Sequence, residues 1–234
     1  MLAFFPLLGV SFVFFALGGA LLRALGVFRG DDTGRYFVLH VVCNAFVTAV
    51  HLDDVWISYW TPSLALAMRP TDTSGAAVIC ALHLYHIAFY RPLPMVDWIH
   101  HLVMIVLMLP LAVALNAGAL LGHGAWFSSG LPGGLDYLML VLVKANVMES
   151  LTEKRLNSFI QTWIRAPGCL YHALFTWIGW RNQFAQVAQG SYLPEWAVLP
   201  ALMVVVMTFF WNGMYFQQRV VANYAIRSTC PAKG

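Results

Sequence analysis

Charged side chains are scarce in this chain. Asp, Glu, Lys and Arg make up 10% of its 234 residues, whereas an average soluble domain has roughly 25%. With 60% hydrophobic residues and a mean hydropathy of +0.71, an ordinary water-soluble domain is excluded. Long polar stretches are also missing, and the most polar interval, 149–165, is far shorter than the roughly 50 residues that a second domain needs. We therefore expect residues 1–234 to form a single membrane-embedded domain.

Cysteine clusters and basic clusters are absent too. The four cysteines show no CxxC spacing, which argues against a disulfide framework and against a cysteine metal site. The net charge of +3 comes from residues scattered at the ends of apolar segments, a distribution that predicts no nucleic-acid partner. The last apolar segment, 196–218, contains no lysine, so a retinal protein with a Schiff base in its seventh helix is disfavoured.

What the chain has is a succession of apolar segments, which predicts an all-α, polytopic transmembrane helical bundle. A helix needs about 20 residues to cross the hydrocarbon core, and about seven segments reach or approach this length. The fifth is the shortest and carries Asp136 and Lys144, so the count is six if it does not cross. We expect the glycine-rich stretch 116–134 to be a connection and 149–165 to be an amphipathic helix at the membrane surface. The predicted spans are 1–22, 36–59, 75–90, 95–115, 131–148, 166–184 and 196–216.

The positions of Lys and Arg predict the orientation. If the N-terminus lies on the outer or lumenal side of seven spans, all but two of the 13 basic residues fall on the opposite side. Such a bias is the positive-inside rule. Without the fifth span, Lys144, Lys154 and Arg155 would move to the other side and the bias would weaken. We therefore expect seven spans and a C-terminus on the cytoplasmic-type, basic side.

The most distinctive stretch is 83–101, HLYHIAFYRPLPMVDWIHH, which holds four of the eight histidines together with Asp97. Ionisable residues inside transmembrane segments are costly and usually functional. Pro92 and Pro94 cannot continue a helix, so the chain reverses there and brings two helix ends to one depth. At about 1.5 Å per helical residue, we place six histidines in the inner half of the membrane, and only His51 and His123 in the outer half. The inner histidines are His40, His83, His86, His100, His101 and His172.

Asp97 precedes His100 and His101 by three and four residues, so all three lie near one helix face. The carboxylate can fix the tautomer of one imidazole and leave the other free as a general base or acid. We therefore interpret Asp97, His100 and His101 as catalytic candidates. The alternative is a hydrogen-bonded polar plug that holds helices together. The lipid- or ligand-binding candidates are His83, His86, His40 and His172.

Metal chemistry is not favoured by the spacing of the histidines. Membrane di-metal hydroxylases carry HxxxH or HxxHH boxes, whereas this chain has HxxH and DxxHH. A bis-histidine haem needs one ligand from each of two helices at one depth, and nothing in the spacing selects such a pair. We predict no metal site and no resident cofactor.

The motif Asp97-x-x-His100-His101 begins a span that follows a short span. A glycine-rich stretch, a short fifth helix and a basic amphipathic link come after it. Over about residues 36–216 this pattern resembles the TLC-domain family, which includes the ceramide synthases and the TRAM translocation proteins. The resemblance implies transfer of an acyl group from acyl-CoA, in which His100 and His101 take part. The acidic HDxSDxxLE run of ceramide synthases has no counterpart here, a departure that favours the smaller relatives with roles in lipid composition.

Two functions stay open on this basis. The first is a lipid enzyme or lipid-binding protein, with membrane lipids as partners and acyl-CoA as a candidate co-substrate. The second is a non-catalytic subunit of a larger membrane complex, whose polar set binds a lipid or stabilises helix packing. A hydrophobic cavity that reaches the histidines favours the first function, and a filled interior favours the second.

Overall fold

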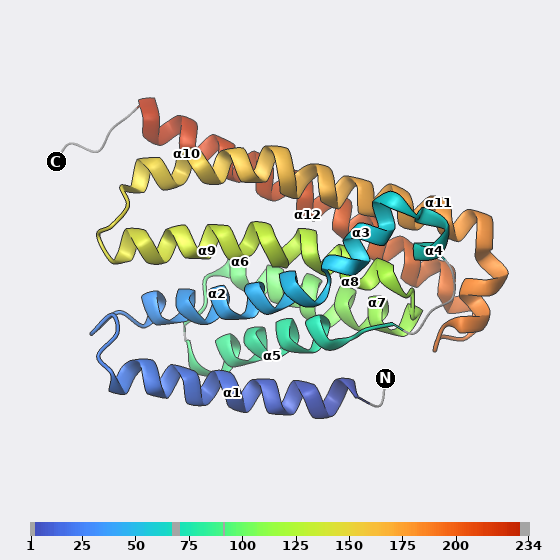
Figure 1. The fold of residues 1–234 in the computed structure, drawn as a ribbon, viewed down its shortest axis with the longest axis horizontal. Helices are drawn as coiled ribbons and strands as arrows, with labels where there is room; N and C mark the ends of the chain where they lie inside the picture. Colours follow the sequence, from blue (N-terminus) through green and yellow to red (C-terminus); the bar gives the residue numbers. More distant parts are fainter. Residues whose placement is uncertain (1–2, 67–70, 91, 230–234) are drawn as a thin grey trace.

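The computed structural model describes residues 3–66, 71–90 and 92–229. In this part of the chain it contains helices and no strand (Figure 1), so the all-α prediction is confirmed. The elements are α1 (Phe4–Ala24), α2 (Asp32–Val50), α3 (Leu52–Trp60), α4 (Pro62–Leu66), α5 (Ser74–Phe89), α6 (Met95–His100), η1 (His101–Met108), α7 (Leu109–Leu115), α8 (Ala119–Ala125), η2 (Trp126–Gly130), α9 (Leu131–Lys144), α10 (Ser150–Ile160), η3 (Gln161–Arg165), α11 (Ala166–Gly190) and α12 (Glu195–Thr229).

Five helical stretches among the described residues are long and apolar enough to cross a membrane, which fits a multi-pass integral membrane protein. They are Phe4–Ala24, Asp32–Val50, Met95–Leu115, Ala119–Lys144 and Glu195–Thr229. Helix α5 is apolar but has 16 residues. Three of the long rods contain a π-helical turn, η1, η2 or η3, which joins two α-helices without a break. Such turns are uncommon and occur frequently at functional sites.

The helices run back and forth along the long axis of the molecule (Figure 1), and the C-terminal part of α12 lies at the end where α1 meets α2. The end with the α1–α2, α5–α6 and α9–α10 connections and the C-terminal part of α12 is here called the basic end. Asp31, the N-cap of α2, accepts a hydrogen bond from the Gly34 backbone N–H at 3.1 Å and pairs with Lys144 Nζ at 2.7 Å. Because Lys144 donates to it, the pKa of the Asp31 carboxyl is lowered. This ion pair ties the start of α2 to the end of α9.

The glycine-rich stretch 116–134 is helical from Ala119 onward, so its prediction as a connection is wrong. The fifth predicted span accordingly begins at Ala119 and ends at Lys144. Its glycines stand at helix contacts: a Cβ at Gly122 would lie 1.9 Å from Asp54 Oδ2, and one at Gly124 would lie 2.6 Å from the Phe209 ring. Small residues let helices approach closely in membranes. Here the glycines mark contacts between helices rather than turns.

The prediction of a surface helix over 149–165 is wrong in its placement. Helix α10 and η3 continue into α11 as one rod, and Glu153, Asn157, Gln161 and Arg165 are all buried. Their spacing of four residues puts them on one face. The outward positions on the same rod include exposed Phe159 and Trp163. The polar face therefore points into the bundle and the apolar face points away from it.

Candidate functional site

Five of the six predicted inner histidines meet at the basic end, as their shared depth predicts. They come from α2, α5, α6 and η1, and His86 Nδ1 lies 3.2 Å from His101 Nε2, within hydrogen-bonding distance. The His83 ring centroid lies 5.2 Å from that of His101, 5.5 Å from that of His100 and 5.9 Å from that of His40. These residues, His40, His83, His86, His100 and His101, are called the imidazole cluster below.

Two tyrosines complete the imidazole cluster. Tyr36 of α2 stacks on His86 with ring centroids 4.1 Å apart, and Tyr137 of α9 stacks on His40 at 3.8 Å. Sequence reasoning missed both. An aromatic residue in an apolar segment looks like any other core residue, so no signal in the sequence distinguishes them.

Several ring nitrogens of the imidazole cluster are buried without a hydrogen-bond partner among the described residues. They are His40 Nε2, His100 Nδ1 and His101 Nδ1. In contrast, His83 Nδ1 lies 2.8 Å from the carbonyl oxygen of Ile79. A buried polar atom without a partner costs roughly 1–3 kcal/mol. Two histidine nitrogens outside the cluster are also buried without a partner among the described residues, so this feature alone does not separate a ligand site from a plug that holds helices together.

Asp97 does not take the role predicted for it. Its half-buried carboxylate makes no hydrogen bond to His100 or His101 in the part of the chain that the structure describes. The backbone from Asp97 to His101 keeps ordinary α-helical spacing, since the His101 N–H bonds to the Asp97 carbonyl oxygen, but both imidazoles lie against histidines of α5 instead of the carboxylate. Asp97 instead lines the cavities beside the cluster.

His172 lies away from the imidazole cluster, so its predicted place among the inner histidines is wrong. Its Nδ1 lies 3.3 Å from His123 Nδ1, and its ring lies 4.2 Å from the Phe209 ring. The rod that carries it begins at Ser150 rather than near 166, which puts His172 roughly 33 Å along that rod. His51, nearby in the opposite half, bonds through Nδ1 to Asp54 Oδ2 at 2.8 Å and is closely packed against Gly75 and Gly122. We call His51, His123 and His172 the second histidine group. Their contacts are those of side chains packed between helices.

Three adjoining cavities follow the interior of the bundle. The first, here the histidine cavity, has a volume of about 570 Å³ and lies beside the α5–α6 reversal. The central cavity, of about 220 Å³, adjoins it. Their shared wall consists of His40, His83, Asp97, His100 and Tyr137. The cluster thus stands between a polar cavity at the basic end and a cavity that leads inward.

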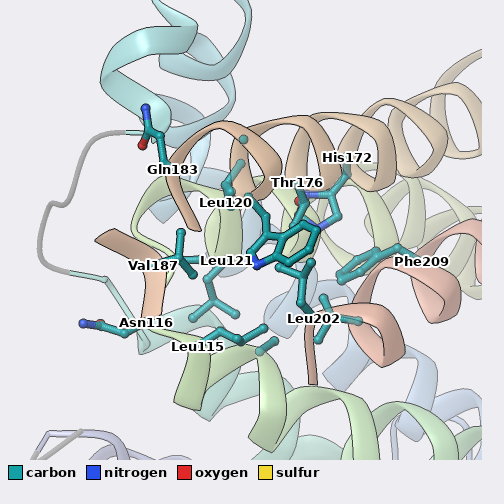
Figure 2. Close-up of a pocket in the computed structure, with 15 residues that line it drawn as sticks. Leu115, Asn116, Leu120, Leu121, His172, Thr176, Gln183, Val187, Leu202 and Phe209 are labelled. Carbon is teal, nitrogen blue, oxygen red and sulfur yellow. The ribbon is translucent and has the colours of Figure 1, made fainter. Parts of the chain in front are cut away.

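The distal cavity, of about 50 Å³, continues from the central cavity through Ala112, Leu121 and Phe209, which line both. Figure 2 shows leucines from several helices and the Phe209 ring around it, with His172 and Thr176 on one side. The lining therefore changes from imidazole and carboxylate groups at the basic end to aliphatic groups deeper in the bundle. An amphiphilic lipid changes in the same way along its length, from a polar head to an apolar chain.

The buried polar face of α10 and η3 lies on the other side of the central cavity. Asn157 Nδ2 donates to Asp136 Oδ1 at 2.7 Å, and Arg165 Nη2 donates to Asn212 Oδ1 at 2.9 Å. Gln161 and Arg165 line the cavity together with His100. Sequence analysis did not include Gln161, Arg165 or Asn212 in a site, although the four-residue spacing of polar side chains over 153–165 was a usable signal.

No protein-family model, curated protein or solved structure matches the chain. The resemblance to the TLC-domain family stays a prediction that rests on the Asp97 to His101 motif. Among the described residues, no group of three or more His, Cys, Asp or Glu side chains is arranged to hold a metal ion. The prediction of no resident cofactor is untested by this geometry. What the arrangement offers chemically is a set of imidazoles beside an apolar interior.

Proposed function

We propose that this protein binds an amphiphilic lipid, with the polar head at the imidazole cluster and the acyl chain in the central and distal cavities. The observation that carries the proposal is the wall of His40, His83, Asp97, His100 and Tyr137, which is common to the polar histidine cavity and the central cavity. A ligand pocket is typically apolar with a few convergent polar groups. The adjoining cavities support this function over that of a non-catalytic subunit with a filled interior.

The chemistry proposed for this site is acyl transfer, as the TLC resemblance implies. An acceptor hydroxyl or amine attacks the acyl carbonyl of a thioester such as acyl-CoA, and the carbon–sulfur bond breaks. An imidazole of His100 or His101 takes the acceptor's proton and returns it to the leaving thiolate, so atoms and charge balance. The unpartnered nitrogens of these two histidines support this role. The histidine cavity would admit the polar donor, and the central cavity would hold the lipid.

The proposal includes seven membrane crossings, with the basic end on the cytoplasmic-type side. The helix ends and connections near that end carry most of the arginines and lysines, among them Arg23, Arg29, Arg35, Lys144, Lys154 and Arg155, as the positive-inside rule requires. Helix α5 is the shortest of the proposed crossings, at 16 residues.

Blocking the passage between the cavities tests lipid binding. Ala112 is buried and lines both the central and distal cavities, so Ala112→Phe fills the junction. We expect the wild-type protein, purified in detergent, to retain a lipid detectable by mass spectrometry, and Ala112→Phe to lose most of it. Val106→Phe is the matched control, because Val106 belongs to the same rod and is exposed on its outer face. Equal lipid retention in the two variants would contradict the proposal.

A further inference from the structure

Arg165 is a buried cation without a carboxylate partner. It ends η3, it is 9% exposed, and it lines the central cavity. Its Nη2 donates to Asn212 Oδ1 at 2.9 Å, and its guanidinium carbon lies 4.6 Å from the centre of the Phe216 ring. Its Nε is buried with no hydrogen-bond partner among the described residues. A guanidinium has five N–H donors, so donors remain for a ligand beside those that face Asn212 and the Cys169 side chain.

The acids that line the same cavity lie beyond ion-pairing distance of Arg165. Asp136 accepts a hydrogen bond from Asn157, and neither Asp136 nor Asp97 forms an ion pair with Arg165 in the described part of the chain. Burying a charge without a counter-charge costs several kcal/mol, and such residues inside membrane proteins mark ligand or ion sites. Arg35 of the same chain shows the structural alternative, since it pairs with Asp32 and also donates to the carbonyl oxygens of Val27 and Phe28.

Gln161 stands one helical turn before Arg165 and lines the same cavity. It is 1% exposed, and its Nε2 donates to Asn157 Oδ1 at 3.2 Å. Its Oε1 has no partner among the described residues. The cavity therefore presents unused cationic donors beside an unused acceptor. A matching ligand carries an anionic oxygen next to a hydroxyl or amine hydrogen.

The position of this pair relative to the imidazole cluster fits the head of an amphiphile. The Phe216 ring lies against Arg165 on one side and 5.9 Å from the His100 ring. From there the central cavity leads to Ala112, Leu121 and Phe209 at its junction with the distal cavity. A head group held at Arg165 lies beside His100, and its chain has an apolar path.

We propose that Arg165 binds the anionic head-group oxygen of an amphiphile, a phosphate or a carboxylate, while Gln161 Oε1 accepts a hydrogen bond from a neighbouring hydroxyl of the ligand. The planar guanidinium fork matches both kinds of oxyanion. Arg219, which lines the same cavity, adds positive charge near its basic end. This inference rests on the proposed function and names the ligand class of that site.

The test measures binding of amphiphiles with one chain length and different heads to the full chain in a neutral detergent. A lysophosphatidic acid supplies a phosphate with a hydroxyl, a fatty acid a carboxylate, and a monoacylglycerol no charge; inorganic phosphate is added alone. We expect an anionic amphiphile to bind about 10- to 100-fold more tightly than the neutral one, as hydrogen bonds to a charged group typically provide. The ratio of the affinities for the two anionic lipids shows whether the site prefers a phosphate or a carboxylate. Tight binding of inorganic phosphate alone would overturn the role of the ligand's acyl chain.

Substitutions of single arginines show which residue produces the preference for an anionic head group. Arg165→Gln should bring the ratio of anionic to neutral affinity close to one, and Arg155→Gln should leave it unchanged, because Arg155 lies exposed on the same rod. A preference that survives Arg165→Gln would overturn the inference. If that variant fails to fold, the wild-type comparison still decides, since equal binding of anionic and neutral lipids overturns the anion site alone. Binding of none of the lipids would overturn the proposed function as well.

Discussion

His86 and His101 face each other across the α5–α6 reversal, with His86 Nδ1 3.2 Å from His101 Nε2. A hydrogen bond between two imidazoles requires one nitrogen to donate and the other to accept. The other nitrogen of His101, Nδ1, is buried and has no partner among the described residues. His86 thus occupies one nitrogen of His101 and leaves the other without a partner among the described residues. In the proposed mechanism this pairing gives His86 the positioning role that the sequence predicts for Asp97.

Replacing His101 tests the catalytic part of the proposal. We expect His101→Ala to lower acyl transfer from acyl-CoA to a lipid acceptor by about 10²- to 10⁴-fold, the usual contribution of a general acid or base. The assay follows a labelled acyl group in vesicles that contain the purified protein. Insertion and thermal stability are measured in parallel, because His101 is buried.

The control for His101→Ala is His51→Ala, which removes a buried imidazole from the second histidine group. His51 lines none of the three cavities, so this variant should lose stability and keep the turnover of its folded fraction. Unchanged turnover in His101→Ala would remove the catalytic role, and lipid binding would then stand alone.

The ion pair between Asp31 and Lys144 predicts a pH dependence at the basic end. The pKa of Asp31 is lowered in the folded protein, first by the hydrogen bond from Lys144. A group with a depressed folded pKa stabilises the protein above its unfolded pKa, about 3.9 for Asp, and this contribution is lost as the pH falls through the folded pKa. Lys144→Gln should therefore lower stability near pH 7 and cease to matter under strongly acid conditions.

The size of the Lys144 effect is small, since partly exposed ion pairs contribute about 0–1 kcal/mol. Thermal unfolding between pH 2.5 and 7 measures it, and Asp31→Asn provides the matched background. In that background Lys144→Gln should change the unfolding temperature little at any pH. An equal loss with and without the Asp31 carboxylate would contradict the assigned pair.

The fold class and the convergence of five histidines followed from sequence because both depend on segment length and depth. The burial of the polar face of 149–165 could not be predicted from the sequence. Helical periodicity predicts that Glu153, Asn157, Gln161 and Arg165 share a face, but it does not indicate which face is buried. In water the apolar face turns inward, whereas this rod buries its polar face and exposes Phe159 and Trp163. For the same reason the sequence does not predict that Arg165 lies inside the bundle, beside the central cavity.

The depth of His172 was mispredicted because its rod begins at Ser150 and not near residue 166. The glycine-rich stretch misled the prediction in a different way: glycine favours turns in soluble proteins, so 116–134 predicts a connection. In the structure Gly122 and Gly124 instead let α8 approach α3 and α11 closely, at Asp54 and His172. Composition alone does not separate a glycine that turns the chain from a glycine that admits a neighbouring helix.

Gly122 provides a direct test of this packing. A Cβ at this position would lie 1.9 Å from Asp54 Oδ2 and 2.3 Å from His51 Nδ1, so Gly122→Ala must displace the hydrogen bond between those two side chains. Overpacking of this kind costs about 1–3 kcal/mol, and we expect a clear fall in the unfolding temperature. Gly9→Ala is the matched control, because a Cβ at Gly9 of α1 meets nothing within 4 Å and Ala favours a helix by about 0.5–1 kcal/mol over Gly. If Gly122→Ala were as stable as Gly9→Ala, α8 would not pack on His51. The stretch 116–134 would then be the connection that its composition suggests.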